Sequence, residues 1–198
     1  MSPAPALLDP ARSRLLNALG LVAVALVLLF AFIDQIFRHD LPCPLCILQR
    51  VGFCGVGVGL ALNLRFGARP SHYAVAILSA MAGALVSVRQ VLLHIVPGTG
   101  SYGEALLGLH FYSWALVLYI AIIAGCAVLL LFDRQFEEPR PGNGPPNAFP
   151  LAALPLAALV LMAALTLGNG VSTVLECGAG LCPDDPAGYQ LLSPSPAP

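Results

Sequence analysis

Apolar residues gather into five long runs, separated by short segments that are rich in charged residues, proline and glycine. Each run comes close to the roughly 20 residues that a helix needs to cross the hydrocarbon core of a bilayer. The runs cover residues 15–37, 46–64, 73–96, 106–132 and 149–168. The pattern predicts an all-α membrane protein with five transmembrane helices.

The composition favours the same class. Of the 198 residues, 58% are hydrophobic and 10% are charged, which is too apolar for an ordinary soluble domain. The nine basic residues are all arginines and are scattered along the chain, and the net charge is −1. No basic patch suits a nucleic acid, so we exclude nucleic acid as a partner and expect the lipid bilayer to surround the chain.

The arginines also predict an orientation. Six of them flank the apolar runs on one side: Arg12, Arg14, Arg65, Arg69, Arg134 and Arg140. Positive residues favour cytoplasmic loops, so this side is predicted to face the cytoplasm. We therefore expect a cytoplasmic N-terminus over residues 1–14, a cytoplasmic linker over 133–148 and an outward-facing tail over 169–198.

Two pairs of closely spaced cysteines lie on the predicted outer side. Cys43 and Cys46 form a CxxC motif between the first two runs, and Cys177 and Cys182 lie in the tail. An even number of spans would leave the second pair in the reducing cytosol, so the shared compartment supports five spans. The other two cysteines lie inside apolar runs, where we expect them to pack.

The CxxC motif is predicted to start a helix. Pro44 disfavours helical geometry in the preceding residue and suits the first helical position, which makes Cys43 the N-cap and puts Cys46 in the first turn. The free amides and the dipole at a helix start favour a thiolate. Gln49 and Arg50 follow on the same face and would offer a donor and a cation to a Cys46 thiolate or a bound anion. Alternatively, Arg50 extends to the lipid headgroups.

The third run carries two further candidates near its outer end, Arg89 and His94. An ionisable residue inside an apolar run indicates a functional site. His94 has two interpretations, a proton donor or a histidine whose hydrogen bonds are satisfied at the membrane interface.

The tail pair has a different character. Four residues, two of them glycine, separate Cys177 from Cys182, which is enough for a turn that closes a disulfide. Nearby carboxylates disfavour a thiolate, so this pair suits attack by another thiol, unless it is a static staple. A chain extended from Gly168 would reach roughly 30 Å by residue 177, far enough to meet Cys43. Two such dithiols would form an electron relay by thiol–disulfide exchange.

The final electron acceptor is expected to come from outside the chain. The sequence has no haem-attachment motif, no glycine-rich nucleotide motif and no carboxylate-rich metal cluster. A quinone that diffuses in the bilayer would approach Cys46 and Arg50 from the lipid side.

The chain resembles the DsbB family of bacterial inner-membrane disulfide bond formation proteins. The resemblance lies in Pro-Cys-Pro-Leu-Cys-Ile-Leu-Gln-Arg at 42–50, in Arg89-Gln90 and in the spacing of the spans over 15–132. It implies a four-helix membrane domain over 15–132, here followed by a fifth helix. It also implies an enzyme that reoxidises a periplasmic DsbA-like protein with a quinone, ubiquinone or menaquinone.

The resemblance assigns roles to individual residues. Cys46 would face the quinone, Cys43 would exchange with the distal cysteine pair, and Arg50 would bind the quinone. Gln49, Arg89 and His94 are the other candidate cofactor-binding residues.

One departure from the family changes the interpretation of the tail. Family members carry the distal pair between spans three and four, but residues 97–105 contain no cysteine. We expect Cys177 and Cys182 to take that role, which leaves open the order of attack and whether the partner is DsbA itself. Glu104 and residues 106–114 are expected to form an interfacial element near the quinone site.

Other functions remain open at this level. Four thiols in one compartment would suit a zinc or copper site, since CxxC and CxxxxC spacings are close to those of structural zinc. A structural membrane subunit would use the cysteines only as staples. A disulfide oxidase dedicated to one substrate and a vitamin K epoxide reductase-like protein are the enzymatic alternatives.

Overall fold

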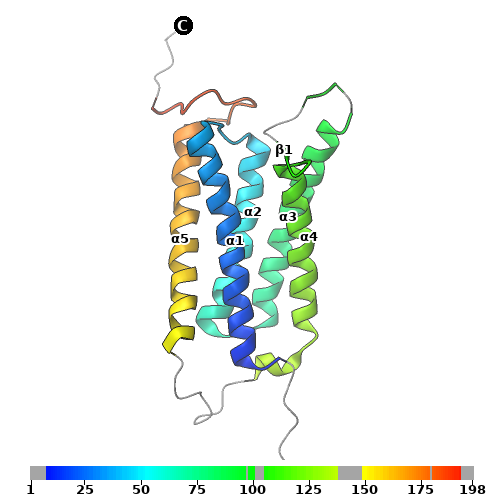
Figure 1. The fold of residues 1–198 in the computed structure, drawn as a ribbon, viewed down its shortest axis with the longest axis vertical. Coiled ribbons are helices and arrows are strands. Elements are labelled where there is room, and N and C mark those ends of the chain that lie inside the picture. Colours follow the sequence, from blue (N-terminus) through cyan, green and yellow to red (C-terminus); the bar gives the residue numbers. More distant parts are fainter. Residues whose placement is uncertain (1–7, 97, 101–104, 138–148, 179, 193–198) are drawn as a thin grey trace, which may run out of the picture.

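Five long helices stand side by side in a bundle (Figure 1). The computed structural model describes residues 8–96, 98–100, 105–137, 149–178 and 180–192. The helices are α1 (Pro10–Arg38), α2 (Pro44–Phe66), α3 (Pro70–His94), α4 (Phe111–Leu130) and α5 (Phe149–Cys177). All five are long and apolar enough to cross a membrane. The prediction of an all-α membrane protein with a fifth helix is confirmed.

Helix α2 packs against α1, α3 and α5. Gly59 lets α3 approach closely, since a Cβ there would lie 2.7 Å from the backbone oxygen of His72 and the backbone nitrogen of Ala76. Gly57 likewise lets α5 approach closely, because the Met162 side chain of α5 occupies the space that a Cβ at position 57 would need. Small residues thus let two neighbours pack tightly against one apolar helix.

The boundary predicted for the fifth helix at residue 168 is wrong, because α5 continues to Cys177. Packing overrides the helix-breaking signal of Gly168-Asn169-Gly170. Asn169 is buried and donates from Nδ2 to the Leu165 carbonyl at 2.9 Å, and Gly168 lies against the ring of Phe32 in α1. The tail pair therefore begins at a helix end, and the estimate of its reach from an extended chain does not apply.

The fourth helix also starts later than the predicted 106. Strands β1 (Ala105–Leu106) and β2 (Leu109–His110) form a hairpin before it. Leu107 and Gly108 have φ values of 53° and 82°, the left-handed geometry that a two-residue hairpin turn requires. The separate element expected at 106–114 is this hairpin with the first turn of α4, whereas Glu104 lies outside the described residues.

The predicted cytoplasmic linker begins with a short 3-10 helix, η1 (Asp133–Phe136), and its residues 138–148 lie outside the described part of the chain. Helix η1 closes one end of the bundle through a group that we call the basal cluster. Its members are Ser13, Asn17, Asn63, Tyr73 and Gln135.

Hydrogen bonds run continuously through the basal cluster. Asn63 donates to Asn17 Oδ1 at 2.8 Å, Asn17 donates to the Tyr73 hydroxyl at 2.7 Å, and Tyr73 donates to Gln135 Oε1 at 2.9 Å. The cluster therefore ties α1, α2, α3 and η1 together. Both cysteine pairs lie at the opposite end of the bundle, where α2 begins and α5 ends (Figure 1).

Candidate redox site

The CxxC motif forms a disulfide at the start of α2, with a Cα–Cα distance of 5.0 Å. Cys43 is the N-cap, and its sulfur accepts a hydrogen bond from the Cys46 backbone N–H at 3.2 Å. Pro44 follows at the start of the helix. The predicted placement of Cys43 and Cys46 is confirmed, and both sulfurs lie at the positive end of the helix dipole.

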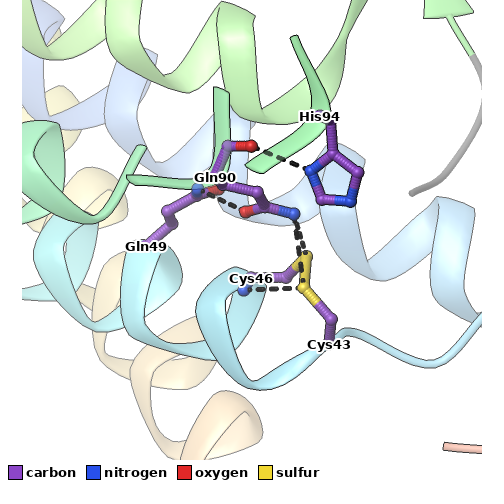
Figure 2. The surroundings of a disulfide bond; sticks show 5 residues. All are labelled: Cys43, Cys46, Gln49, Gln90 and His94. Carbon is purple, nitrogen blue, oxygen red and sulfur yellow. Dashed lines mark hydrogen bonds between the residues drawn. A yellow bond between two sulfur atoms is a disulfide. The ribbon is translucent and has the colours of Figure 1, made fainter. Parts of the chain in front are cut away.

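Gln90 of α3 points its amide group at the disulfide (Figure 2). Its Nε2 lies 3.4 Å from the sulfur of Cys43 and 3.5 Å from that of Cys46. Its Oε1 accepts a hydrogen bond from Gln49 Nε2 at 2.8 Å, which fixes the orientation of the amide. Gln49 therefore acts on the sulfurs through Gln90, and a thiolate at either cysteine would find a donor in place.

Neither His94 nor Arg89 makes a hydrogen bond to the disulfide. His94 pairs through Nδ1 with the Gln90 backbone carbonyl at 2.8 Å, and its ring stacks on Tyr112 at 5.4 Å. Arg89 is exposed on α3 and makes no hydrogen bond or ion pair with the residues that the structure describes. The role of both residues as cofactor ligands stays a prediction.

A cavity of about 460 Å³ opens beside the disulfide, between α1, α2, α4 and the hairpin. Cys46 lines the cavity, whereas Cys43 does not. Asp34, Asp40, Gln49 and Arg50 add polar groups, and most of the remaining surface is apolar. The aromatic side chains in the wall are Phe30, Phe53, Phe111, Tyr112 and Trp114. An apolar cavity with a few polar groups is typical of a small-molecule site.

Arg50 lines this cavity but is turned toward α1. Its guanidinium donates to Gln35 Oε1 at 2.5 Å and to the Ala31 carbonyl at 3.1 Å, and it lies over the ring of Phe32 at 5.5 Å. The structure thus places Arg50 beside the same cavity as Cys46 without a direct bond between them.

Gln35 joins Arg50 to the fifth helix and the tail. Its Nε2 donates to the Ser172 hydroxyl and to the Tyr189 hydroxyl, both at 2.8 Å. We call Gln35, Arg50, Ser172, Glu176 and Tyr189 the outer cluster. The cluster connects α1, α2, α5 and the tail at the end of the bundle that holds both disulfides.

The tail pair is also a disulfide, with a Cα–Cα distance of 4.4 Å. Cys177 is 4% exposed, whereas Cys182 is only partly buried. The tail folds back over the end of α5, because the backbone N–H groups of Gln190 and Leu191 donate to the carbonyls of Glu176 and Leu175. The disulfide is therefore docked on the helix end.

The sequence interpretation gave no role to Gln35 and Tyr189, used Gln90 only as part of the family resemblance, and used Glu176 only as one of the carboxylates near the tail pair. Polar residues near the ends of apolar helices were the available signal for Gln35 and Glu176. Within the described residues, no three or more His, Cys, Asp or Glu side chains are grouped so as to hold a metal ion.

The fold and the site define a multi-pass membrane protein with a CxxC disulfide at the start of a membrane-spanning helix. The family model described as "Disulfide bond formation protein DsbB" matches residues 13–101. The match includes the CxxC motif and Gln90, but neither α4 nor α5.

Curated relatives carry the same description. Disulfide bond formation protein B of Nitrosomonas eutropha is 32% identical over 110 residues, which cover 51% of this chain and 68% of the relative. The protein of that name from Cupriavidus necator is 37% identical over 83 residues, 41% of this chain and 48% of the relative. The protein of that name from Burkholderia thailandensis is 33% identical over 99 residues, which cover 47% of this chain and 56% of the relative.

The chain belongs to the DsbB family. It spans about half the length of the Cupriavidus necator and Burkholderia thailandensis relatives. No solved structure matches it.

Proposed function

We propose that this protein is a quinone-dependent thiol–disulfide oxidoreductase that reoxidises a periplasmic DsbA-like dithiol protein and so supports disulfide bond formation. Electrons pass from the partner to the tail pair, then to the CxxC pair, and then to a membrane quinone. The observation that carries the proposal is the opening of the Cys46 side of the disulfide into an apolar cavity that Arg50 also lines.

We place the protein in the bacterial inner membrane with both cysteine pairs on the periplasmic side. Two observations support this orientation. Six of the nine arginines flank the spans on the side opposite to the CxxC motif, and both disulfides lie at one end of the bundle (Figure 1).

The cavity residues fit a quinone. The aromatic side chains of the wall suit a flat ring, and the guanidinium of Arg50 and the amide of Gln49 offer donors for a carbonyl oxygen. A quinone bound there would accept two electrons and two protons and leave as the quinol.

The tail pair receives electrons first. A partner thiolate attacks the sulfur of Cys182, which is the more accessible of the two, and Cys177 leaves as a thiolate and takes up a proton. The second partner thiol then attacks the mixed disulfide and releases Cys182. The partner departs with a disulfide, and the tail pair holds its two electrons and two protons.

The tail dithiol next reduces the CxxC pair. A tail thiolate attacks Cys43, the bond to Cys46 breaks, and Cys46 leaves as a thiolate that the helix dipole and Gln90 Nε2 stabilise. The other tail cysteine resolves the mixed disulfide, so that the tail disulfide reforms. Because Cys43 and Cys177 are both buried, the tail must release from the end of α5 during this exchange.

The test adds quinone to the reduced protein and follows quinone absorbance and free thiols. We expect Cys46→Ala to abolish quinone reduction. We expect Cys177→Ala to reduce quinone but to accept no electrons from a dithiol protein. Cys54→Ala, which removes a free cysteine of α2, is the matched control. Equal losses in the Cys46 and Cys177 variants would refute the ordered relay.

A further inference from the structure

Gln35 is a buried glutamine of α1 that the relay described above does not use. Its side chain is 3% exposed, and its amide is hydrogen-bonded to three other parts of the molecule. Oε1 accepts from Nη1 of Arg50 in α2 at 2.5 Å. Nε2 donates to the Ser172 hydroxyl of α5 and to the Tyr189 hydroxyl of the tail, both at 2.8 Å. Both amide hydrogens and the amide oxygen are therefore engaged.

The two hydroxyl groups determine which end of the Gln35 amide faces Arg50. Because Nε2 is turned toward Ser172 and Tyr189, Oε1 points at the guanidinium and accepts from it. The reversed amide would place its NH2 group against the guanidinium, where two donors cannot bond each other. Helix α5 and the tail thus hold Gln35 in the one orientation that binds Arg50.

Arg50 is in turn held beside the cavity that it lines. The Ala31 carbonyl accepts from Nη2 at 3.1 Å, and Gln35 accepts from Nη1. The guanidinium has five N–H groups, so these two bonds leave further donors for a ligand in the cavity. Gln35 does not line the cavity itself, so it acts on such a ligand through Arg50.

We propose that Gln35 is a positioning residue for quinone binding, because its hydrogen bond to Arg50 transmits the docking of the tail to the cavity. The inference rests on the proposed function. The docked tail orients Gln35, and an arginine that is already in place binds a quinone with less loss of entropy, so tail docking and quinone binding favour each other. In the relay, the tail docks again once its disulfide has reformed. The CxxC pair is then reduced and requires a quinone.

The test measures quinone affinity in the full chain with both disulfides intact, so that no electrons are transferred. Trp114 is the only tryptophan of the chain and lines the cavity, so quenching of its fluorescence by a short-chain ubiquinone gives the Kd. We expect Gln35→Leu to raise the Kd about tenfold, since Arg50 loses the acceptor that holds it. Tyr189→Phe removes only the acceptor in the tail and should raise the Kd about threefold.

The basal cluster provides matched controls, because it also contains a buried glutamine and a tyrosine that are bonded to each other. Tyr73 donates to Gln135 Oε1 at 2.9 Å, at the opposite end of the bundle. Gln135→Leu and Tyr73→Phe should therefore leave the Kd unchanged. In a Gln35→Leu background, Tyr189→Phe should have no further effect, because the hydroxyl acts through Gln35.

Hydrogen–deuterium exchange measures the same coupling at the tail. The backbone N–H groups of Gln190 and Leu191 bond the tail to the end of α5. We expect the short-chain ubiquinone to slow their exchange in the wild type and to leave it unchanged in Gln35→Leu. A glutamine that only stabilised the fold would not transmit this effect.

Three results would overturn the inference while quinone still binds. They are an unchanged Kd in Gln35→Leu, a full effect of Tyr189→Phe in that background, and tail exchange that does not respond to quinone. If Gln35→Leu does not fold, the Kd of Tyr189→Phe and the exchange of the wild type decide. A wild-type protein that binds no quinone would refute the proposed function, and the inference with it.

Discussion

The two ends of the bundle carry buried polar clusters of opposite character. The basal cluster contains only neutral side chains, and none of its buried oxygen or nitrogen atoms lacks a partner. The outer cluster contains Arg50 and the unpaired Glu176, and it adjoins a cavity and two disulfides. A network in which every polar group is hydrogen-bonded specifies how the helices pack. A network with charged and unpaired groups leaves those groups able to interact with a ligand or a reacting sulfur.

Breaking the basal cluster should have the largest effect on stability and none on chemistry. Asn17→Leu removes the donor to Tyr73 and the acceptor of Asn63, so we expect the free energy of unfolding to fall by about 3 kcal/mol. Thermal unfolding in detergent measures the loss. Leu19→Ala, at a half-exposed position of α1, is the control. A slower quinone reduction by folded Asn17→Leu would contradict the division between the two ends.

Arg50→Gln tests whether a change in the outer cluster impairs quinone reduction. Loss of the guanidinium should raise the KM for quinone about thirtyfold, since a charge-assisted hydrogen bond contributes about 2 kcal/mol. Steady-state kinetics with a soluble quinone measures the change. Arg65→Gln is a matched control, because Arg65 lies at the far end of α2 and also over a phenylalanine ring. Equal effects of the two substitutions would remove Arg50 from the site.

Gln90→Leu should have a smaller effect. It deletes the donor that faces both sulfurs, so the Cys46 thiolate loses stabilisation and quinone reduction should slow about tenfold. Stopped-flow measurement of quinone absorbance gives the rate, with Leu92→Ala on the exposed face of α3 as the control. An unchanged rate would show that the contact is only structural.

Tyr189→Phe should have the smallest effect. It removes one acceptor of Gln35 and loosens the tail by about 1 kcal/mol. Hydrogen–deuterium exchange should then increase over residues 180–192 while thermal unfolding of the bundle stays the same. If the tail exchange did not change, Gln35 would not be what docks the tail.

The sequence alone predicted those features of the structure that depend on residues adjacent along the chain. Pro44 determines how α2 starts, so the positions of Cys43 and Cys46 were predictable. Five apolar runs likewise predicted five helices. Both features follow from short stretches of chain.

Features that depend on contacts between helices were not predictable. Gly168-Asn169-Gly170 is locally a helix stop, and only packing against α1 keeps α5 helical to Cys177. Arg50 was expected on the face of Cys46, but Gln35 of another helix sets its direction. The charge of Arg89 drew attention on α3, whereas the neutral Gln90 beside it is the residue that faces the disulfide.

The position of α5 separates the site where the partner protein would bind from the cavity where the quinone would bind. This helix packs against α1 and α2 with its disulfide at the tip, while the cavity beside Cys46 has no wall from α5. In the proposed function, the periplasmic partner protein binds at the end of α5, next to the tail disulfide, and the membrane quinone enters the cavity on the side of α4 and the hairpin. Because the partner protein and the quinone bind at separate sites, both can be bound at once and turnover can proceed through a ternary complex.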